Sequence, residues 1–146
     1  MKGCYCLIIE LEKTTPIKIG KRLGEIQFRK GHYVYVGSAM NSLEARVKRH
    51  LSDEKKLHWH VDYLLSDKNS EIVDVVYAES SRNVECDLSK QIEDDNGIEG
   101  FGCSDCECES HLYYFKNRKD AIEHVKDAYG SIALEYYNLN NLKGKF

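Results

Sequence analysis

The chain has 146 residues, of which 42% are hydrophobic and 31% are charged. This length suits one globular domain whose core needs no disulfide or metal, and the composition excludes an intrinsically disordered chain. No apolar run reaches the roughly 18 residues that a membrane helix requires, and no signal-peptide pattern opens the chain. We therefore expect a cytoplasmic protein with no membrane partner, whose six cysteines are mostly thiols.

The net charge of −3 excludes a generally basic nucleic-acid binder, but the charges are unevenly distributed along the chain. Residues 13–60 hold eleven Lys or Arg and four Asp or Glu. Residues 61–113 hold three Lys or Arg and fourteen Asp or Glu. One interpretation is a phosphate-attracting surface in the first half of the chain. The other is that the two halves neutralise each other across the fold.

The first half of the chain predicts two core strands around a small insertion. Residues 4–11 are almost continuously apolar, which is typical of a buried strand. Residues 12–30 form an insertion that predicts a polar hairpin, with strands at 17–19 and 25–28. Residues 32–37 are aromatic and β-branched and predict the second core strand.

Helical periodicity follows the second strand. Leu43, Val47 and Leu51 recur at i, i+4 and i+8, which predicts a helix over 42–51 with these side chains toward the core. A second helix is predicted near 57–65, although residues 58–60 also fit an extended segment.

The second half continues as strand, helix, strand and helix. The predicted elements are a strand at 72–78, a helix at 84–92, a strand at 111–115, a helix at 121–130 and a short helix at 132–139. The last two helices form a C-terminal extension over 117–146. We expect one domain over 1–146 of the α/β class (α+β type), with helices around a mixed or antiparallel sheet of three to four strands. Because no crossover helix separates the first two strands, the sheet cannot be all parallel.

Two tyrosine–glycine tripeptides precede a polar helix face. A Gly-Cys-Tyr tripeptide ends at Tyr5, and a Tyr-Val-Gly tripeptide runs from Tyr35 to Gly37. On the next helix, Arg46 and His50 are four residues apart and so share a face. Gly37 would let the backbone approach a ligand, Arg46 can bind phosphate oxygens, and a tyrosine can relay a proton.

This arrangement resembles the GIY-YIG nuclease superfamily, in which two strands carry such tripeptides and the next helix supplies an arginine. The similarity is greatest to a branch of small domains sometimes fused to endonuclease III-type DNA glycosylases. Four ordered blocks carry it, at residues 31–39, 57–65, 85–88 and 100–112. The resemblance implies a GIY-YIG-like fold, a DNA substrate rather than RNA, and a DNA-repair glycosylase as a partner.

The resemblance also implies roles for five residues. Tyr5 and Tyr35 match the motif tyrosines, one of which helps to activate water. Arg46 matches the arginine that stabilises the phosphoryl group, and His50 matches a histidine of some members. Glu85 matches the glutamate that anchors one divalent cation, which would be Mg²⁺ or Mn²⁺. The implied reaction is metal-assisted hydrolysis of phosphodiester bonds, in the context of DNA repair.

Residues near these five are candidates for substrate binding, or else form an ordinary solvated face. The candidates are Gly37, Ser38, Lys48, Arg49, Lys55, Lys56 and His58. Trp59 fits either a core anchor or a platform for base stacking. A silent nucleic-acid-binding or repair-partner module is the alternative to an enzyme.

A cysteine-rich segment forms a second candidate site. Cys103, Cys106, Cys108 and His111 could hold Zn²⁺, with His58 or His60 as a further ligand, and would then make a zinc-binding interaction domain. A reduced cysteine-rich loop and a disulfide are the other interpretations. The three remaining cysteines, Cys4, Cys6 and Cys86, are expected to pack as small apolar side chains.

Overall fold

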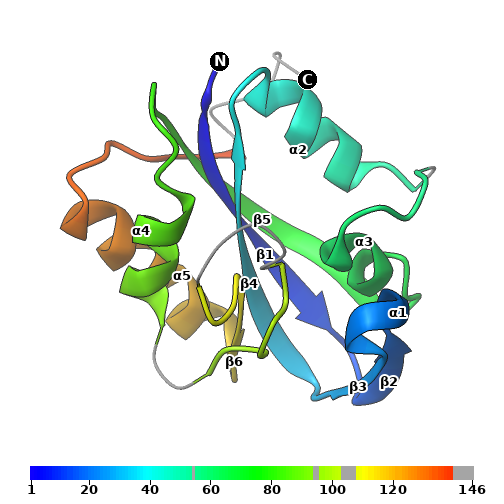
Figure 1. Ribbon diagram of the computed structural model, residues 1–146. Helices are drawn as coiled ribbons and strands as arrows, with labels where there is room; N and C mark the ends of the chain where they lie inside the picture. Colours follow the sequence, from blue (N-terminus) through cyan, green and yellow to red (C-terminus); the bar gives the residue numbers. More distant parts are fainter. Residues whose placement is uncertain (54, 94–95, 103–107, 140–146) are drawn as a thin grey trace.

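The structure is a computed structural model that describes residues 1–53, 55–93, 96–102 and 108–139. A five-stranded antiparallel sheet in the order β6-β4-β1-β5-β7 forms the centre, and a separate two-stranded sheet joins β2 to β3 (Figure 1). The strands are β1 Gly3–Leu11, β2 Thr15–Lys18, β3 Glu25–Phe28, β4 Gly31–Ala39, β5 Ser70–Glu79, β6 Leu112–Phe115 and β7 Tyr137–Asn138. The helices are α1 Gly20–Leu23, α2 Leu43–Leu51, α3 His60–Leu65, α4 Glu85–Ile92 and α5 Arg118–Ser131.

Strand β1 is the middle of the sheet because it pairs along its length with both β4 and β5. Both of its faces are buried, which explains the nearly continuous apolar sequence. One face, carrying Leu7 and Ile9, packs against α2, α3 and the β2–β3 hairpin. The other face, carrying Cys4, Cys6 and Ile8, packs against α4 and α5. Figure 1 shows the two pairs of helices on opposite sides of the sheet.

The α+β class, the hairpin within 12–30 and the absence of an all-parallel sheet are confirmed. The predicted three to four strands are too few, because the main sheet has five. The fifth strand, β7, lies where a helix over 132–139 was predicted, and that prediction is wrong. Val76 and Tyr77 of β5 pair with Asn138 and Tyr137. Tyr137 and Asn138 thus extend the edge of the sheet.

Helix α2 begins as its sequence predicts, but its last turn buries a different side chain from the predicted one. The hydroxyl of Ser42 accepts the N–H of Ala45 and caps the helix. Leu43 and Val47 are buried, but Leu51 is 42% exposed, and His50 is only 2% exposed. The prediction that Leu51 faces the core is therefore wrong, because a hydrogen bond lets His50 take the buried position.

Candidate active site

A cavity of about 490 Å³ lies where β1 begins and β4 ends. Four predicted catalytic residues from four different elements line it: Tyr5 from β1, Tyr35 from β4, Arg46 from α2 and Glu85 from α4. The other lining residues are Ser38, Trp59, Asn83, Cys86, Asp87 and Gly102. The four predicted catalytic residues, up to 80 positions apart in the sequence, are thus brought to one polar cavity.

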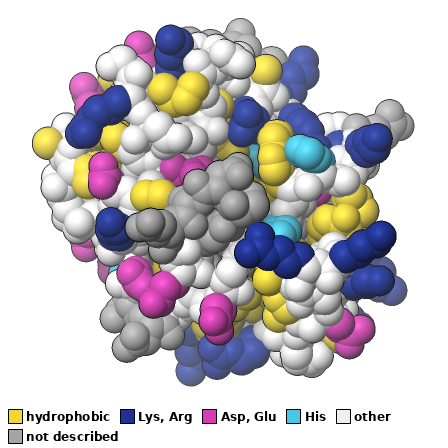
Figure 2. Space-filling view, viewed as in Figure 1, with side chains coloured by type: hydrophobic (Ala, Val, Ile, Leu, Met, Phe, Trp, Pro, Cys, Tyr) yellow, Lys and Arg dark blue, Asp and Glu magenta, His cyan; other side chains and the backbone are white. Residues whose placement is uncertain are grey.

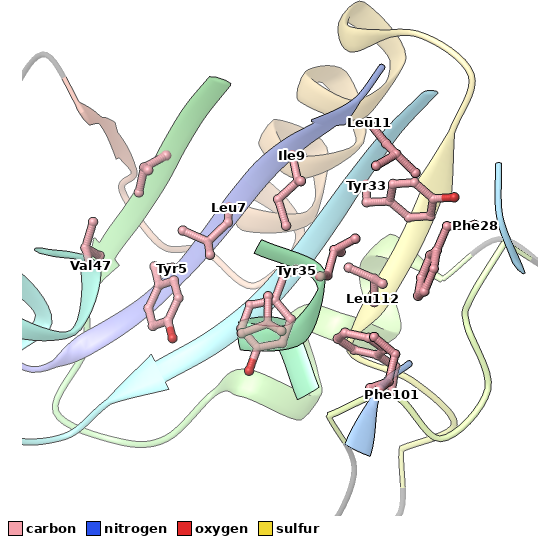
Figure 3. Close-up of a cluster of buried hydrophobic side chains, with 14 of the residues drawn as sticks. Tyr5, Leu7, Ile9, Leu11, Phe28, Tyr33, Tyr35, Val47, Phe101 and Leu112 are labelled. Carbon is pink, nitrogen blue, oxygen red and sulfur yellow. The ribbon is translucent and has the colours of Figure 1, made fainter. Parts of the chain in front are cut away.

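The strand register places both tyrosines on the same face of the sheet. Tyr5 lies opposite Gly37, and Leu7 lies opposite Tyr35, so the two tyrosines are diagonal neighbours. Their ring centroids are 6.4 Å apart, and both rings project to the same side in Figure 3. A Cβ added at Gly37 would lie 2.4 Å from the Tyr5 ring. Gly37 therefore makes room for Tyr5, and the approach of its backbone to a ligand stays a prediction.

His50 holds the hydroxyl of Tyr5. The Tyr5 oxygen and Nε2 of His50 are 2.7 Å apart, and both residues are buried. Burial raises the pKa of Tyr5, and the nearby Arg46 charge offsets only part of this increase. Burial also lowers the pKa of His50 to about 3. Both groups are therefore neutral at pH 7, and Nδ1 of His50 has no hydrogen-bond partner among the described residues.

This buried histidine predicts a loss of stability in acid. An unfolded histidine has a pKa near 6.5, so protons bind the unfolded chain more strongly. The stabilising contribution of His50 is complete above about pH 6.5 and is lost as the pH falls toward 3, by at most about 1.4 kcal/mol per pH unit. Urea unfolding between pH 7 and 4 measures the slope, and His50→Gln should reduce it. An equal slope in wild type and His50→Gln would contradict the assignment.

Arg46 reaches the cavity from α2 and is fixed by two contacts. Its Nη1 donates to the carbonyl oxygen of Ser38 at 3.0 Å, and its guanidinium lies 4.5 Å from the centre of the Trp59 ring. Ser38, predicted as a substrate contact, thus lines the cavity and positions the arginine. The guanidinium has five N–H donors, so it can bind a negatively charged ligand in addition to the Ser38 carbonyl oxygen.

Glu85 is the first residue of α4 and lies near other side chains whose oxygen atoms could bind a metal ion. Its backbone N–H donates to Oδ1 of Asn83 at 3.0 Å, and Asn83 and Asp87 are exposed at the same cavity. Carboxylate and amide oxygens at a solvent-accessible position fit Mg²⁺ or Mn²⁺, which keep several waters. Asn83 was not predicted as a site residue, although its alternation with Glu85 and Asp87 is visible in the sequence.

A second group of metal-ligating side chains lies beside Glu85. Atoms of Cys86, Cys108 and His111 lie within 4.8 Å of one another, so these residues could hold a metal ion. The hydroxyl of Ser89 is 2.6 Å from Nδ1 of His111 and fixes the orientation of the imidazole. Nε2 is 3.7 Å from a carboxylate oxygen of Glu85.

This group differs from the predicted one in its membership. Cys86, expected only to pack, joins Cys108 and His111 because the N-terminus of α4 lies beside the segment before β6. Cys103 and Cys106 lie outside the described residues. His60, considered as a further ligand, has its Nδ1 2.8 Å from the donating N–H of Gly102. Burial lowers the pKa of His111, which keeps the imidazole neutral.

The predicted basic substrate contacts divide into two kinds. Arg49 forms two hydrogen bonds with the buried Asp62, and Lys55 donates to the carbonyl oxygens of His50 and Ser52 at the end of α2. These two cations therefore stabilise the fold. Lys48, Lys56 and His58 are exposed. Figure 2 shows Lys and Arg side chains on the side of α1 and α2, and a mixture of Lys, Arg, Asp and Glu on the side of α4.

The fold and the cavity define an α+β domain with a polar site at the end of its sheet. Within this class the chain belongs to the family described as "Domain of unknown function DUF123", whose profile matches residues 4–134. No curated protein and no solved structure matches the chain. Among the described helices, none is long and apolar enough to cross a membrane.

Proposed function

We propose that the protein is a metal-dependent nuclease that hydrolyses phosphodiester bonds in DNA. The observation that carries this proposal is the meeting of two tyrosines, Arg46 and Glu85 at one cavity. Each group supplies a different requirement of the reaction: hydroxyls near the nucleophile, a cation for the phosphate, and a carboxylate for the metal. The GIY-YIG resemblance of the sequence supports the same assignment, as do the exposed Lys48 and Lys56.

Tyr5 and His50 orient the attacking water. In the tautomer that carries hydrogen on Nδ1, neutral His50 accepts the hydroxyl hydrogen of Tyr5 through Nε2. The Tyr5 oxygen then has lone pairs for a water in the cavity. Because both groups are neutral at pH 7, the Tyr5 oxygen accepts a hydrogen bond from the water and orients it, while His50 holds the Tyr5 hydroxyl in place.

Arg46 and Glu85 act on the phosphate and the cation. The guanidinium of Arg46 binds phosphate oxygens and stabilises the negative charge that increases in the transition state. Glu85, with Asn83 and Asp87 nearby, would hold Mg²⁺ or Mn²⁺. When bound, the cation acts as a Lewis acid on the phosphate and stabilises the leaving oxygen. Tyr35 completes the wall beside Tyr5 and offers a second hydroxyl.

Cleavage of labelled DNA tests the proposal. Plasmid, branched duplexes and RNA are incubated with wild type, Arg46→Ala and the control Arg118→Ala, in Mn²⁺, Mg²⁺ or EDTA. Arg118 is an exposed arginine on α5, which packs on the opposite face of the sheet. We expect cation-dependent DNA cleavage that Arg118→Ala keeps and Arg46→Ala lowers at least about 100-fold. Salt-sensitive DNA binding without cleavage in any metal would instead identify a silent repair-partner module.

A specific observation favours a second, structural metal. Two thiols and an imidazole are the donors that Zn²⁺ prefers, so we propose zinc at Cys86, Cys108 and His111. The Ser89 hydroxyl fixes the imidazole, as the outer partners of zinc-bound histidines do. A zinc ion there would join the start of α4 to the segment before β6 and would fix Glu85 at the cavity.

Metal removal gives a direct prediction. Purified protein should contain about one zinc per chain, and chelation should lower Tm, because a metal that binds only the folded state stabilises it. Cys86→Ser and Cys108→Ser should each reduce the zinc content, whereas Cys4→Ala, on the buried face toward α5, should keep it. Elemental analysis and thermal unfolding measure both effects. Zinc-free protein whose Tm is unchanged by chelation would exclude this metal.

A further inference from the structure

Trp59, the only tryptophan of the chain, lies between the cavity and a group of basic side chains. The guanidinium of Arg46 is 4.5 Å from the centre of its ring, and that of Arg49 is 4.3 Å away. The rings of His50 and His58 also contact it, at 5.9 Å and 5.3 Å between centroids. An indole with so many neighbours has little free ring surface for stacking on a base.

Asp62 holds the segment that carries Trp59. Its carboxylate is fully buried and accepts hydrogen bonds from the backbone N–H groups of His58 and Trp59, both at 2.9 Å. It also accepts two hydrogen bonds from Arg49, at 3.0 Å and 2.9 Å. Arg49 in turn donates to the carbonyl oxygen of Lys56. One buried carboxylate thus fixes both the backbone at Trp59 and the arginine that packs on its ring.

These contacts form a continuous path from Asp62 to the cavity. Asp62 fixes Arg49 and the Trp59 backbone, and the Trp59 ring supports the guanidinium of Arg46. The hydrogen bond to the carbonyl oxygen of Ser38 is the second contact that holds this guanidinium. A long, flexible arginine is thereby oriented before any ligand binds, and such preorganisation is what a transition-state contact requires.

We infer that Trp59 is a positioning residue for Arg46, supported by the Asp62–Arg49 pair. This role rests on the proposed phosphodiester hydrolysis, but the orientation of Arg46 is a property of the protein without substrate. The indole attracts the cation through its ring face, and it excludes water from one side of the guanidinium. Phenylalanine keeps an aromatic face at this position, whereas leucine removes it.

Two measurements on Trp59→Leu and Trp59→Phe test the inference. The first is the NMR shift of the Arg46 Hε proton, assigned by its loss in Arg46→Lys. A guanidinium stacked on an indole should show an upfield Hε shift that Trp59→Leu abolishes and Trp59→Phe partly retains. The second is cleavage: Trp59→Leu should lower kcat about 10- to 100-fold with little change in KM, and phenylalanine should restore most of it.

The outcomes separate this inference from the proposed function. An Arg46 Hε shift that is the same in wild type and Trp59→Leu overturns the positioning role, as does an unchanged kcat. If wild type cleaves no substrate, the proposed function fails, and the NMR comparison still decides whether Trp59 orients Arg46. Arg49→Lys keeps the charge but not the paired hydrogen bonds to Asp62. It should therefore reduce the upfield shift of Arg46 Hε, as Trp59→Leu does, but by less.

Discussion

Replacement of Glu85 by glutamine is expected to lower kcat for DNA cleavage by at least about 100-fold. The substitution keeps the size of the side chain but removes the charge that would attract a divalent cation. Loss of an outer partner of a metal ligand already costs about 10- to 100-fold, and Glu85 would be a direct ligand. Its side chain is 25% exposed at the cavity, so the fold should tolerate the change.

Initial rates at increasing Mn²⁺ concentrations measure this effect. If the defect lies in cation binding, high Mn²⁺ should restore part of the rate of Glu85→Gln. The matched control is Glu123→Gln, because Glu123 is an exposed carboxylate on α5. Cleavage by Glu85→Gln at the wild-type rate at every Mn²⁺ concentration would remove Glu85 from the site.

Asp62→Asn is expected to lower the free energy of unfolding by about 3–5 kcal/mol, the largest stability effect that we predict. The Asp62 carboxylate is fully buried and accepts hydrogen bonds from the Arg49 guanidinium and from the backbone at His58 and Trp59. An asparagine amide offers one acceptor oxygen instead of two and leaves Arg49 without its counter-charge. The positive charge of Arg49 then has no counter-charge, and at least one of the N–H groups that bind Asp62 loses its acceptor.

Urea unfolding at pH 7 measures the loss, with Asp127→Asn on the exposed side of α5 as the control.

The pH dependence of the free energy of unfolding tests the same carboxylate. Burial raises the pKa of Asp62, but the hydrogen bonds from Arg49, Trp59 and His58 outweigh it, so the folded pKa is lowered. The stabilisation by Asp62 is therefore complete above the unfolded pKa of about 3.9 and is lost as the pH falls through the folded pKa. A loss below about 1 kcal/mol in Asp62→Asn would show that this cluster is not a main support of the fold.

The sequence predicts most of the elements because their periodicities are local. The apolar run that became β1, the aromatic run of β4 and the spacing of Leu43 and Val47 each identify an element without reference to the rest of the chain. The strand register then brings Tyr5 and Tyr35 together, and Arg46 follows on the next helix.

The features that the sequence does not predict depend on contacts between distant segments. His50 is buried because Tyr5, 45 residues earlier, offers it a hydrogen bond. Cys86 joins Cys108 and His111 only through the packing of α4 beside the segment before β6. Residues 137–138 form a strand because they pair with the edge of β5. The local sequence pattern, which predicted a helix here, contains no information about that distant edge.

Terbium luminescence tests the central claim, that Glu85 holds a hard cation in the cavity formed with the two tyrosines and Arg46. Trp59 is the only tryptophan and lines this cavity, so excitation of Trp59 should sensitise Tb³⁺ bound at Glu85. We predict saturable Tb³⁺ emission that Mg²⁺ and Mn²⁺ displace, that Glu85→Gln abolishes and that Glu123→Gln keeps. Absence of sensitised emission in wild type, or equal emission from Glu85→Gln, would contradict a cation site in this cavity.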